Sequence, residues 1–124
     1  MYRHILVVED EAALRAIIAR NLTSRGYRVT EAETAAAAIA AAQEAHPDLI
    51  LLDLNLPDRS GWDVLRELRA RHLEVPTVIV SAVRASQGRL AEFQPLAYLP
   101  KPFPLEALLR IVAGGCRAAA TAAV

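Results

Sequence analysis

Short apolar runs and helical patterns alternate along the chain at nearly regular intervals. Five of these runs predict strands, because a strand buried in a parallel sheet has a short, continuous apolar sequence. The five predicted strands cover residues 5–8, 27–30, 49–52, 77–80 and 96–99. The second run, Tyr27-Arg28-Val29-Thr30, is more polar than the others, which suits the edge of a sheet.

Apolar residues recur every three or four positions between these strands, which is typical of helices with one buried face. In the first predicted helix the inward residues are Leu14, Ile17, Ile18 and Leu22. In the second, which begins at Thr34, they are Ala35, Ala38, Ile39 and Ala42. In the third and the last helix they are Trp62, Leu65 and Leu68, and Leu105, Leu108, Leu109 and Val112.

Glycines provide C-terminal stops for two of these helices: Gly26 for the first and the Gly114-Gly115 pair for the last. The stretch from Arg84 to Phe93 has only a weak helical pattern, with Gly88 inside it. A fourth helix is expected there.

Five strands that alternate with five helices predict an α/β fold, a doubly wound parallel sheet with helices on both faces. We expect the flavodoxin-like strand order 2-1-3-4-5, with the first strand central and the third beside it. In such folds ligands bind beyond the carboxyl ends of the strands, where the strand order reverses. The ends of the strands are therefore where chemistry is expected.

The composition narrows the class of protein. A length of 124 residues suits one domain, and 14 basic residues balance 14 acidic ones, which argues against direct binding of nucleic acid or an anionic membrane. No apolar run is long enough to span a membrane, and no signal-peptide pattern follows Met1. The only cysteine, Cys116, is interpreted as an inert thiol, in keeping with a cytoplasmic location. We expect one domain at residues 1–115 and an alanine-rich tail at 116–124.

Acidic residues follow two of the strands. Glu9 and Asp10 come directly after the first strand, and Asp53 follows the third. Two like charges about 4 Å apart repel by roughly 4 kcal/mol at an effective dielectric constant of about 20, so three converging carboxylates need protons or a cation. Lys101, after the fifth strand, can offset one charge. An oxygen-only ligand set suits a hard divalent ion, and we expect Mg²⁺, with Mn²⁺ as a substitute.

Asp53 is the candidate nucleophile of this site. Burying a carboxylate at the end of an apolar strand is costly, and a carboxylate can attack a phosphoryl group to give an aspartyl phosphate. The metal and Lys101 would stabilise the oxygens of the transferred group. The hydroxyl of Ser81, at the end of the fourth strand, would donate to one of them.

Each of these residues has a simpler explanation when it is taken alone. Glu9 or Asp10 could cap the first helix, where negative charge is favourable. The others could be ordinary turn, loop or strand-end residues: Asp53, Lys101, Ser81 and Tyr98. Their common place at converging strand ends favours a phosphoryl-transfer site over these separate explanations.

The chain resembles the receiver domain of two-component response regulators over essentially its full length. Five stretches carry the resemblance, in the order and spacing of that family: "HILVVEDE", "DLILLDLNLP", "SGWDVL", "VIVSA" and "YLPKPF". The resemblance implies a bacterial phosphorelay protein that accepts a phosphoryl group from a sensor histidine kinase or a histidine phosphotransfer protein. Such a domain is not a metabolic enzyme, because it catalyses only its own phosphotransfer and autodephosphorylation.

The resemblance also implies a role for each site residue. Asp53 is the phosphoacceptor, and the metal is held by Glu9, Asp10, Asp53 and the backbone carbonyl of Asn55. The groups that contact the phosphoryl group or move with it are Ser81, the backbone N–H of Ala82, Tyr98 and Lys101. The Lys101-Pro102 peptide bond is expected to be cis, which is plausible chiefly before proline.

The chain departs from the family pattern in three ways. The acidic pair is Glu-Asp instead of the commoner Asp-Asp, and the segment between Ser81 and Tyr98 is short. The sequence "FQPLAY" also lacks the Gly-Ala pair that usually precedes the aromatic residue. We therefore expect a shortened or irregular fourth helix on the face, shared with the fifth strand and helix, that usually contacts targets. A downstream target, an output domain in a larger protein and a homodimer all stay open.

The sequence argues against three other functions. A pseudo-receiver would have the fold without phosphotransfer, but the complete set of acidic, hydroxyl and lysine residues argues against it. A haloacid-dehalogenase-type phosphohydrolase has its nucleophile on the first strand in a DxD pattern, whereas here Asn55 stands two positions after Asp53. A flavodoxin-type flavin domain needs a phosphate-binding loop after the first strand, where Glu9-Asp10-Glu11 would repel the anion.

Overall fold

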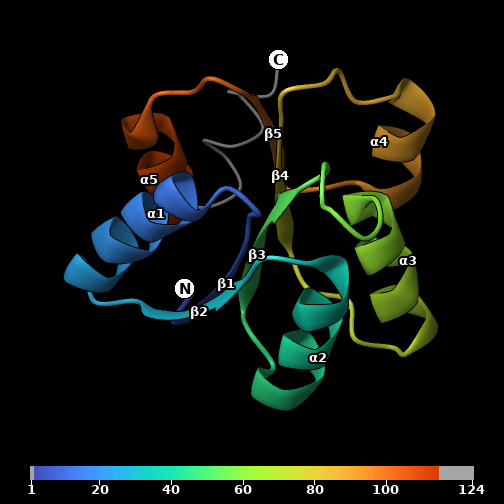
Figure 1. The fold of residues 1–124 in the computed structure, drawn as a ribbon, viewed down its shortest axis with the longest axis horizontal. Coiled ribbons are helices and arrows are strands. Elements are labelled where there is room, and N and C mark those ends of the chain that lie inside the picture. The colour runs from blue at the N-terminus through green and yellow to red at the C-terminus, as the bar shows by residue number, and fades with distance from the viewer. Residues whose placement is uncertain (1, 115–124) are drawn as a thin grey trace.

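The structure is a computed structural model that describes residues 2–114. One parallel sheet has the strand order β2-β1-β3-β4-β5, which confirms the predicted doubly wound fold (Figure 1). The strands are β1 His4–Val8, β2 Arg28–Ala32, β3 Leu49–Asp53, β4 Thr77–Ser81 and β5 Ala97–Pro100. The helices are α1 Ala12–Ser24, α2 Ala35–Ala45, α3 Gly61–Ala70, α4 Gln87–Phe93 and α5 Leu105–Gly114.

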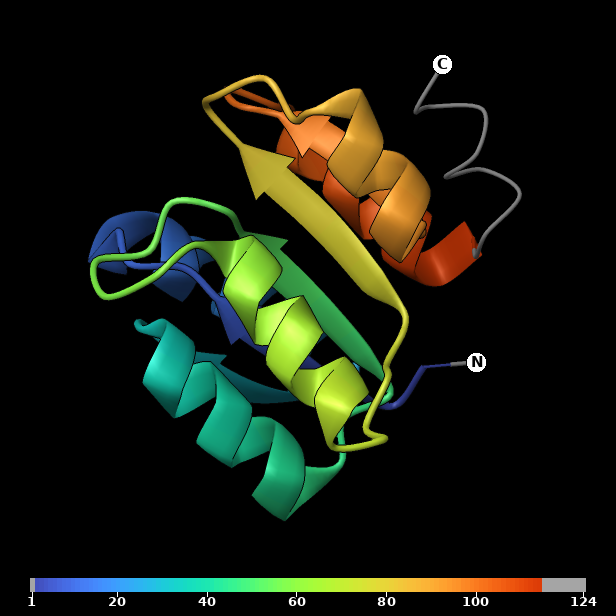
Figure 2. The same ribbon diagram turned by 90° about the vertical axis from the view of Figure 1, so that its right-hand side faces the viewer.

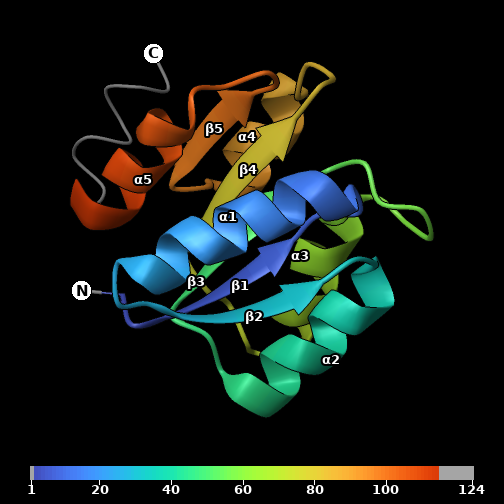
Figure 3. The same cartoon turned by 60° about the vertical axis from the view of Figure 1, so that its left-hand side comes forward.

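The helices form a layer on each side of the sheet. Helices α1 and α5 cover one face (Figure 3), and α2, α3 and α4 lie on the other (Figure 2). Side chains along a strand point to opposite faces, so Ile5 and Val7 belong to the core under α1 and α5, while Leu6 and Val8 belong to the core under α2 and α3. No helix within residues 2–114 is long and apolar enough to cross a membrane.

The predicted inward faces of the helices hold with one exception. All four predicted inward residues of α2 are buried, and Leu108, Leu109 and Val112 are buried in α5. In α1 the prediction for Ile17 is wrong, because this side chain is 45% exposed. The buried line of α1 runs through residues four apart, Leu14, Ile18 and Leu22, and Ile17 lies to one side of it.

Helix α4 is short, as the sequence predicts, and is attached to the body mainly through its last residue. It has seven residues, none of them buried. The ring of Phe93 stacks on Trp62 of α3 with centroids 5.6 Å apart, and the guanidinium of Arg69 lies 4.6 Å from the centre of the Phe93 ring. Arg69 donates to the side chain of Glu74, which orients its guanidinium, and to the Glu92 carbonyl. Side chains of α3 therefore hold the C-terminal end of α4.

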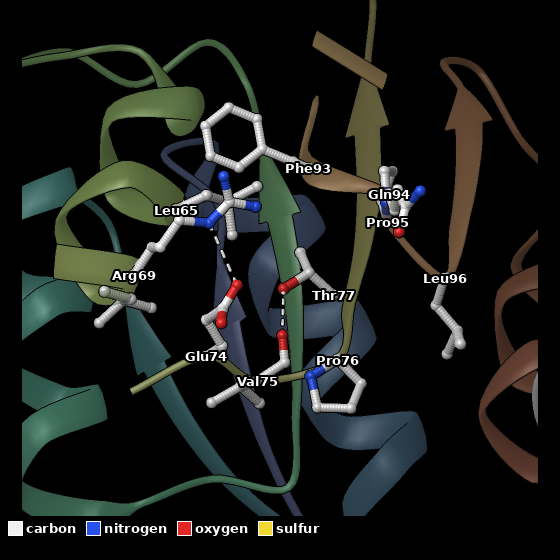
Figure 4. Close-up of a pocket in the computed structure, with 11 residues that line it drawn as sticks. Leu65, Arg69, Glu74, Val75, Pro76, Thr77, Phe93, Gln94, Pro95 and Leu96 are labelled. Atoms are coloured by element: carbon white, nitrogen blue, oxygen red, sulfur yellow. Dashed lines mark hydrogen bonds and ion pairs between the residues drawn. The ribbon is translucent and has the colours of Figure 1, made fainter. Parts of the chain in front are cut away.

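A cavity of about 240 Å³ lies below this contact (Figure 4). It is bounded by the end of α3 and by the segments that lead into β4 and β5. Its location at the amino ends of these strands separates it from Glu9, Asp10 and Asp53, which stand at the carboxyl ends of β1 and β3.

Candidate functional site

Glu9 is buried and comes directly after the carboxyl end of β1. Its backbone N–H donates to the Ala32 carbonyl at 3.0 Å, and its side chain is only 2% exposed. Carboxylate atom Oε2 accepts from the backbone N–H of Glu11 at 3.1 Å. The N-cap position of α1 belongs to Glu11, which makes no side-chain cap hydrogen bond, so capping by Asp10, one of the simpler explanations, is not observed. Asp10 is exposed.

Asp53 ends β3 and is also buried, with 2% of the residue exposed. Atom Oδ1 accepts from the backbone N–H of Asn55 at 3.0 Å, and Oδ2 accepts from Lys101 Nζ at 3.0 Å. Both carboxylate oxygens are therefore held by contacts within the domain. This orientation follows from the position of Asp53 as the last residue of a strand paired with β4.

The loop after Asp53 folds tightly against the strand end because of Gly61. The Gly61 N–H donates to the Leu54 carbonyl at 2.8 Å. A Cβ atom at Gly61 would lie 2.6 Å from the Asp53 carbonyl oxygen, closer than any real side chain can approach. The glycine that opens α3 therefore sets how closely that helix approaches the phosphoacceptor candidate.

Asp58 ties the same loop to the neighbouring helix α2. Its two carboxylate oxygens accept from the backbone N–H groups of Ala35 and Ala36 at 2.8 and 3.0 Å. These are unpaired donors of the first turn of α2, where negative charge is favourable. The two hydrogen bonds lower the pKa of Asp58 below its ordinary value.

Lys101 reaches across from the end of β5 to both buried carboxylates. Its backbone N–H donates to the Ser81 carbonyl at 2.7 Å, and its peptide bond to Pro102 is cis. Atom Nζ lies 2.9 Å from Glu9 Oε1 and 3.0 Å from Asp53 Oδ2. The contact with Oε1 is an ion pair, since no hydrogen bond of good geometry reaches that buried atom from residues 2–114.

These contacts leave the site short of positive charge. Burial raises the pKa of Glu9 to about 7, against the opposing effects of Lys101 and the Glu11 N–H, and the charge of Asp53 raises it further. Burial lowers the pKa of Lys101, but its contacts with Glu9 and Asp53 outweigh burial and raise it overall. One ammonium group therefore does not neutralise the two buried carboxylates.

The carboxylates can hold a cation together. One oxygen from each of Glu9, Asp10 and Asp53 lies within 4.8 Å of the others. The three carboxylates offer the hard oxygen donors that Mg²⁺ prefers, and one of them, Glu9, has a buried oxygen without a directed hydrogen bond from residues 2–114. The residues present therefore fit the metal that the sequence predicts.

An open pocket of about 400 Å³ brings most of the predicted site residues together. Six of them line it: Glu9, Asp10, Asp53, Asn55, Ala82 and Lys101. Ser81 is buried just behind the pocket and lines a neighbouring groove. Tyr98 lines neither.

Ser81 and Tyr98 are linked to each other through Val83, a residue that the sequence analysis missed. The Ser81 hydroxyl donates to the Val83 carbonyl at 2.7 Å and accepts from the Val83 N–H at 3.0 Å. The Tyr98 hydroxyl donates to the same carbonyl at 3.1 Å. A serine whose hydroxyl bonds the backbone two residues further along is typical of a serine turn. The position of Ser81 two residues before Val83 was therefore the one feature of the sequence that could have indicated this contact.

Arg15 is a second residue that sequence reasoning missed. Its side chain donates to the Glu9 backbone carbonyl at 2.8 Å and pairs with Glu31 at 3.2 Å. These contacts join the first turn of α1 to the backbone just after β1 and to a side chain near the end of β2. Arg15 therefore fixes the backbone of a metal-ligand candidate without entering the pocket.

Comparison with known proteins identifies the family of this chain. A family model for the response regulator receiver domain matches residues 5–113. The transcriptional regulatory protein KdpE of Mycobacterium tuberculosis is 41% identical over 107 residues, which are 85% of this chain and 47% of that protein. The chain spans about half the length of the curated relatives it matches.

Two solved structures extend the comparison to the fold. The non-phosphorylated HemR receiver domain of Leptospira biflexa has a TM-score of 0.82 and 31% identity, over 90% of this chain and 92% of that one. The response regulator protein TrrA of Thermotoga maritima, solved in complex with Mg(2+)-BeF, has a TM-score of 0.78 and 27% identity, over 90% and 97%. The chain belongs to the family of response regulator receiver domains of two-component systems.

Proposed function

We propose that this chain is a phosphorylation-dependent signalling switch with Asp53 as its phosphoacceptor. The observation that carries the proposal is the environment of the Asp53 carboxylate. It is buried, faces an open pocket and is held by Lys101 Nζ at 3.0 Å beside two further carboxylates. A carboxylate with this support is suited to attack a phosphoryl group and to stay ordered while it does so.

The proposed reaction is a transfer from phosphohistidine. An Asp53 carboxylate oxygen attacks phosphorus, the phosphorus–nitrogen bond to the donor imidazole breaks, and the imidazole nitrogen keeps the electron pair and gains a proton. The Lys101 ammonium stabilises the negative charge on the phosphoryl oxygens, which it can reach from its place next to Oδ2. Hydrolysis of the acyl phosphate by water returns Asp53 and phosphate, so the domain acts only on its own phosphoryl group.

Glu9, Asp10 and Asp53, with the backbone carbonyl of Asn55, would hold Mg²⁺, or Mn²⁺ in its place. The ion supplies charge neutralisation to the phosphoryl oxygens, the contribution that divalent ions make in phosphoryl transfer. Glu9 and Asp53 share one lysine, which leaves negative charge for a cation to balance, and this supports the assignment. The Mg(2+)-BeF complex of TrrA supports it as well.

The output step begins at the Val83 carbonyl. A phosphoryl group on Asp53 would attract the Ser81 hydroxyl and the Ala82 N–H as donors, and Val83 would lose its hydrogen bond from Ser81, now 2.7 Å long. The Val83 carbonyl would move once it loses Ser81, which would disturb the hydrogen bond that Tyr98 donates to it and allow Tyr98 to change rotamer. These movements would bias the surface around α4, β5 and α5 between two states.

The proposed partners follow from this cycle. A sensor histidine kinase or a histidine phosphotransfer protein supplies the phosphoryl group in the bacterial cytoplasm. A target protein, an output domain or a second copy of the chain reads the changed surface. Its relatives include transcriptional regulatory proteins about twice its length, and we infer that any DNA contact belongs to a segment beyond this receiver domain.

Intact mass after incubation with acetyl phosphate tests the proposal. Wild type should gain one phosphoryl group in Mg²⁺ and none in excess chelator. Asp53→Asn should gain none, and Asp63→Asn, an α3 aspartate paired with Arg66, should behave as wild type. If Asp53→Asn is still labelled, the acceptor is wrong. If neither acetyl phosphate nor a phosphohistidine protein labels wild type, the domain is a pseudo-receiver.

A further inference from the structure

A second hollow, of about 440 Å³, lies beside the phosphoacceptor pocket and has the opposite charge. It runs between the loop that joins β3 to α3 and the loop that joins β4 to α4. Arg59 stands on the first loop, and Arg84 and Arg89 stand on the second loop and on α4. No acidic residue from 2 to 114 lines it, whereas the adjoining pocket is lined by four acidic residues. We refer to it as the arginine groove.

Two of the three arginines have no internal partner. Arg59 and Arg84 are exposed and form no ion pair or side-chain hydrogen bond with any residue from 2 to 114. The arginines along α3 are different, because each pairs with a nearby carboxylate. Arg89 pairs with Glu92 at 3.3 Å, in an exposed contact of the kind that contributes little. The groove therefore offers cationic groups that the domain itself does not neutralise.

We propose that the arginine groove binds an acidic segment of a protein partner. Guanidinium groups match carboxylates with paired hydrogen bonds, and Arg59 and Arg84 approach the groove from its two sides. Between them lie apolar side chains, among them Leu56 and the partly buried Trp62. A glutamate chain can place its methylene groups on this apolar floor and its carboxylate against an arginine.

The surroundings favour an acidic peptide over nucleic acid. Asn55 and Leu56 line both the groove and the phosphoacceptor pocket, so the groove opens directly beside the carboxylates of Glu9 and Asp53. A nucleic acid backbone that continued past the groove would meet this negative charge, and the chain as a whole has no net positive charge. A short acidic segment can end before that point. Inorganic phosphate would use the arginines but gain nothing from the apolar floor.

Trp62 provides a direct probe, because it is the only tryptophan of the chain and lines the groove. Trp62 fluorescence and the backbone amide shifts of Ser60 and Ser86 would be followed during titration with a capped tri-glutamate peptide, on unphosphorylated protein. We expect a saturable change at all three reporters that weakens as salt rises. Arg59→Ala combined with Arg84→Ala should weaken binding by about fivefold, as for the loss of two exposed ion pairs.

The matched control is Arg20→Ala combined with Arg28→Ala. It removes the same charge from exposed arginines on α1 and β2 that have no carboxylate partner in the described chain, and it should bind the peptide as wild type does. Equal weakening in both double variants would refute a specific groove, as would no saturable change at any reporter. Equal or tighter binding of inorganic phosphate would make it a simple anion site. Tighter binding of a single-stranded oligonucleotide of equal charge would make it a nucleic acid site. Either result overturns the peptide proposal.

Discussion

Replacing Glu9 with glutamine should stabilise the metal-free domain above neutral pH. Glu9 is buried at the end of β1, and one lysine has to balance both its charge and that of Asp53. Burial is the main reason that its pKa rises to about 7. Glutamine has the same shape without the charge, so the variant keeps the packing while removing the carboxylate that is costly to ionise.

The size of the effect follows from the pKa difference between the two states. In the unfolded chain Glu9 has a pKa of 4.5, so below that pH it is protonated in both states and affects stability little. Between pH 4.5 and 7 the unfolded state ionises first, and the wild type loses stability as the pH rises. One pKa unit corresponds to about 1.4 kcal/mol, so above pH 7 ionised Glu9 costs about 3 kcal/mol.

Urea unfolding in excess chelator at pH 5 and pH 8.5 measures this difference. We expect Glu9→Gln to raise the free energy of unfolding by about 3 kcal/mol at pH 8.5 and by less than about 1 kcal/mol at pH 5. The exposed neighbour Glu11 provides the control, and Glu11→Gln should stay within about 0.5 kcal/mol of wild type at both pH values. Mg²⁺ should stabilise wild type more than Glu9→Gln, since the variant lacks one ligand.

A gain that is absent at pH 8.5 would refute this reasoning, and so would a gain that is equal at both pH values. The first result would mean that Lys101 compensates Glu9 fully. The second would mean that glutamine improves packing or hydrogen bonding without any electrostatic effect.

Three further predictions concern the supports of the site. Gly61→Ala places a Cβ atom 2.6 Å from the Asp53 carbonyl oxygen, so it should lower the free energy of unfolding in urea by about 1–3 kcal/mol. A Cβ atom at Gly88 meets nothing within 4 Å, so the control Gly88→Ala should not destabilise the domain. Equal effects of the two variants would contradict the packing argument. Phe93→Ala removes the aromatic stack on Trp62, so the backbone amides of α4 should exchange hydrogen faster, while those of α5 keep their rates. Unchanged exchange rates in α4 would mean that the loops on either side of α4, and not this stack, hold the helix. The pKa of Asp58 is lowered in the folded state, so its contribution to stability is present at neutral pH and is lost as the pH falls through its folded pKa. Asp58→Asn should therefore lower the thermal unfolding temperature at pH 7 and have little effect in acid. An equal loss at both pH values would contradict this prediction.

The sequence alone determined the architecture and the location of the chemistry. The type of each element follows from the spacing of apolar residues along the chain, which is a local property of the sequence. The rules for connecting parallel strands then allow few ways to arrange these strands and helices in a sheet. The strand order and the convergence of Glu9, Asp10 and Asp53 could be predicted for this reason. The short α4 was expected from the resemblance to receiver domains, because the segment between Ser81 and Tyr98 is short for that family. The predicted tail at 116–124, with Cys116, lies outside the described residues.

Strand ends were predicted less well than strand existence. Strand β2 runs to Ala32, two residues past its predicted end, because Glu31 and Ala32 pair with β1 although Glu31 is charged. Ile17 shows the same limit in a helix, since its exposure depends on how α1 is rotated on the sheet. Pairing and packing decide such details, and neither is visible in a local pattern.

Only the tertiary structure decided how the site works electrostatically. The charge on Glu9 depends on burial and on Lys101, which is distant in sequence, and no spacing rule measures either. The Val83 carbonyl likewise joins Ser81 of β4 to Tyr98 of β5, and the arginine groove lies between two loops. Local periodicity determines which elements form, whereas the pKa values and the grooves depend on distances between elements that only the folded packing sets.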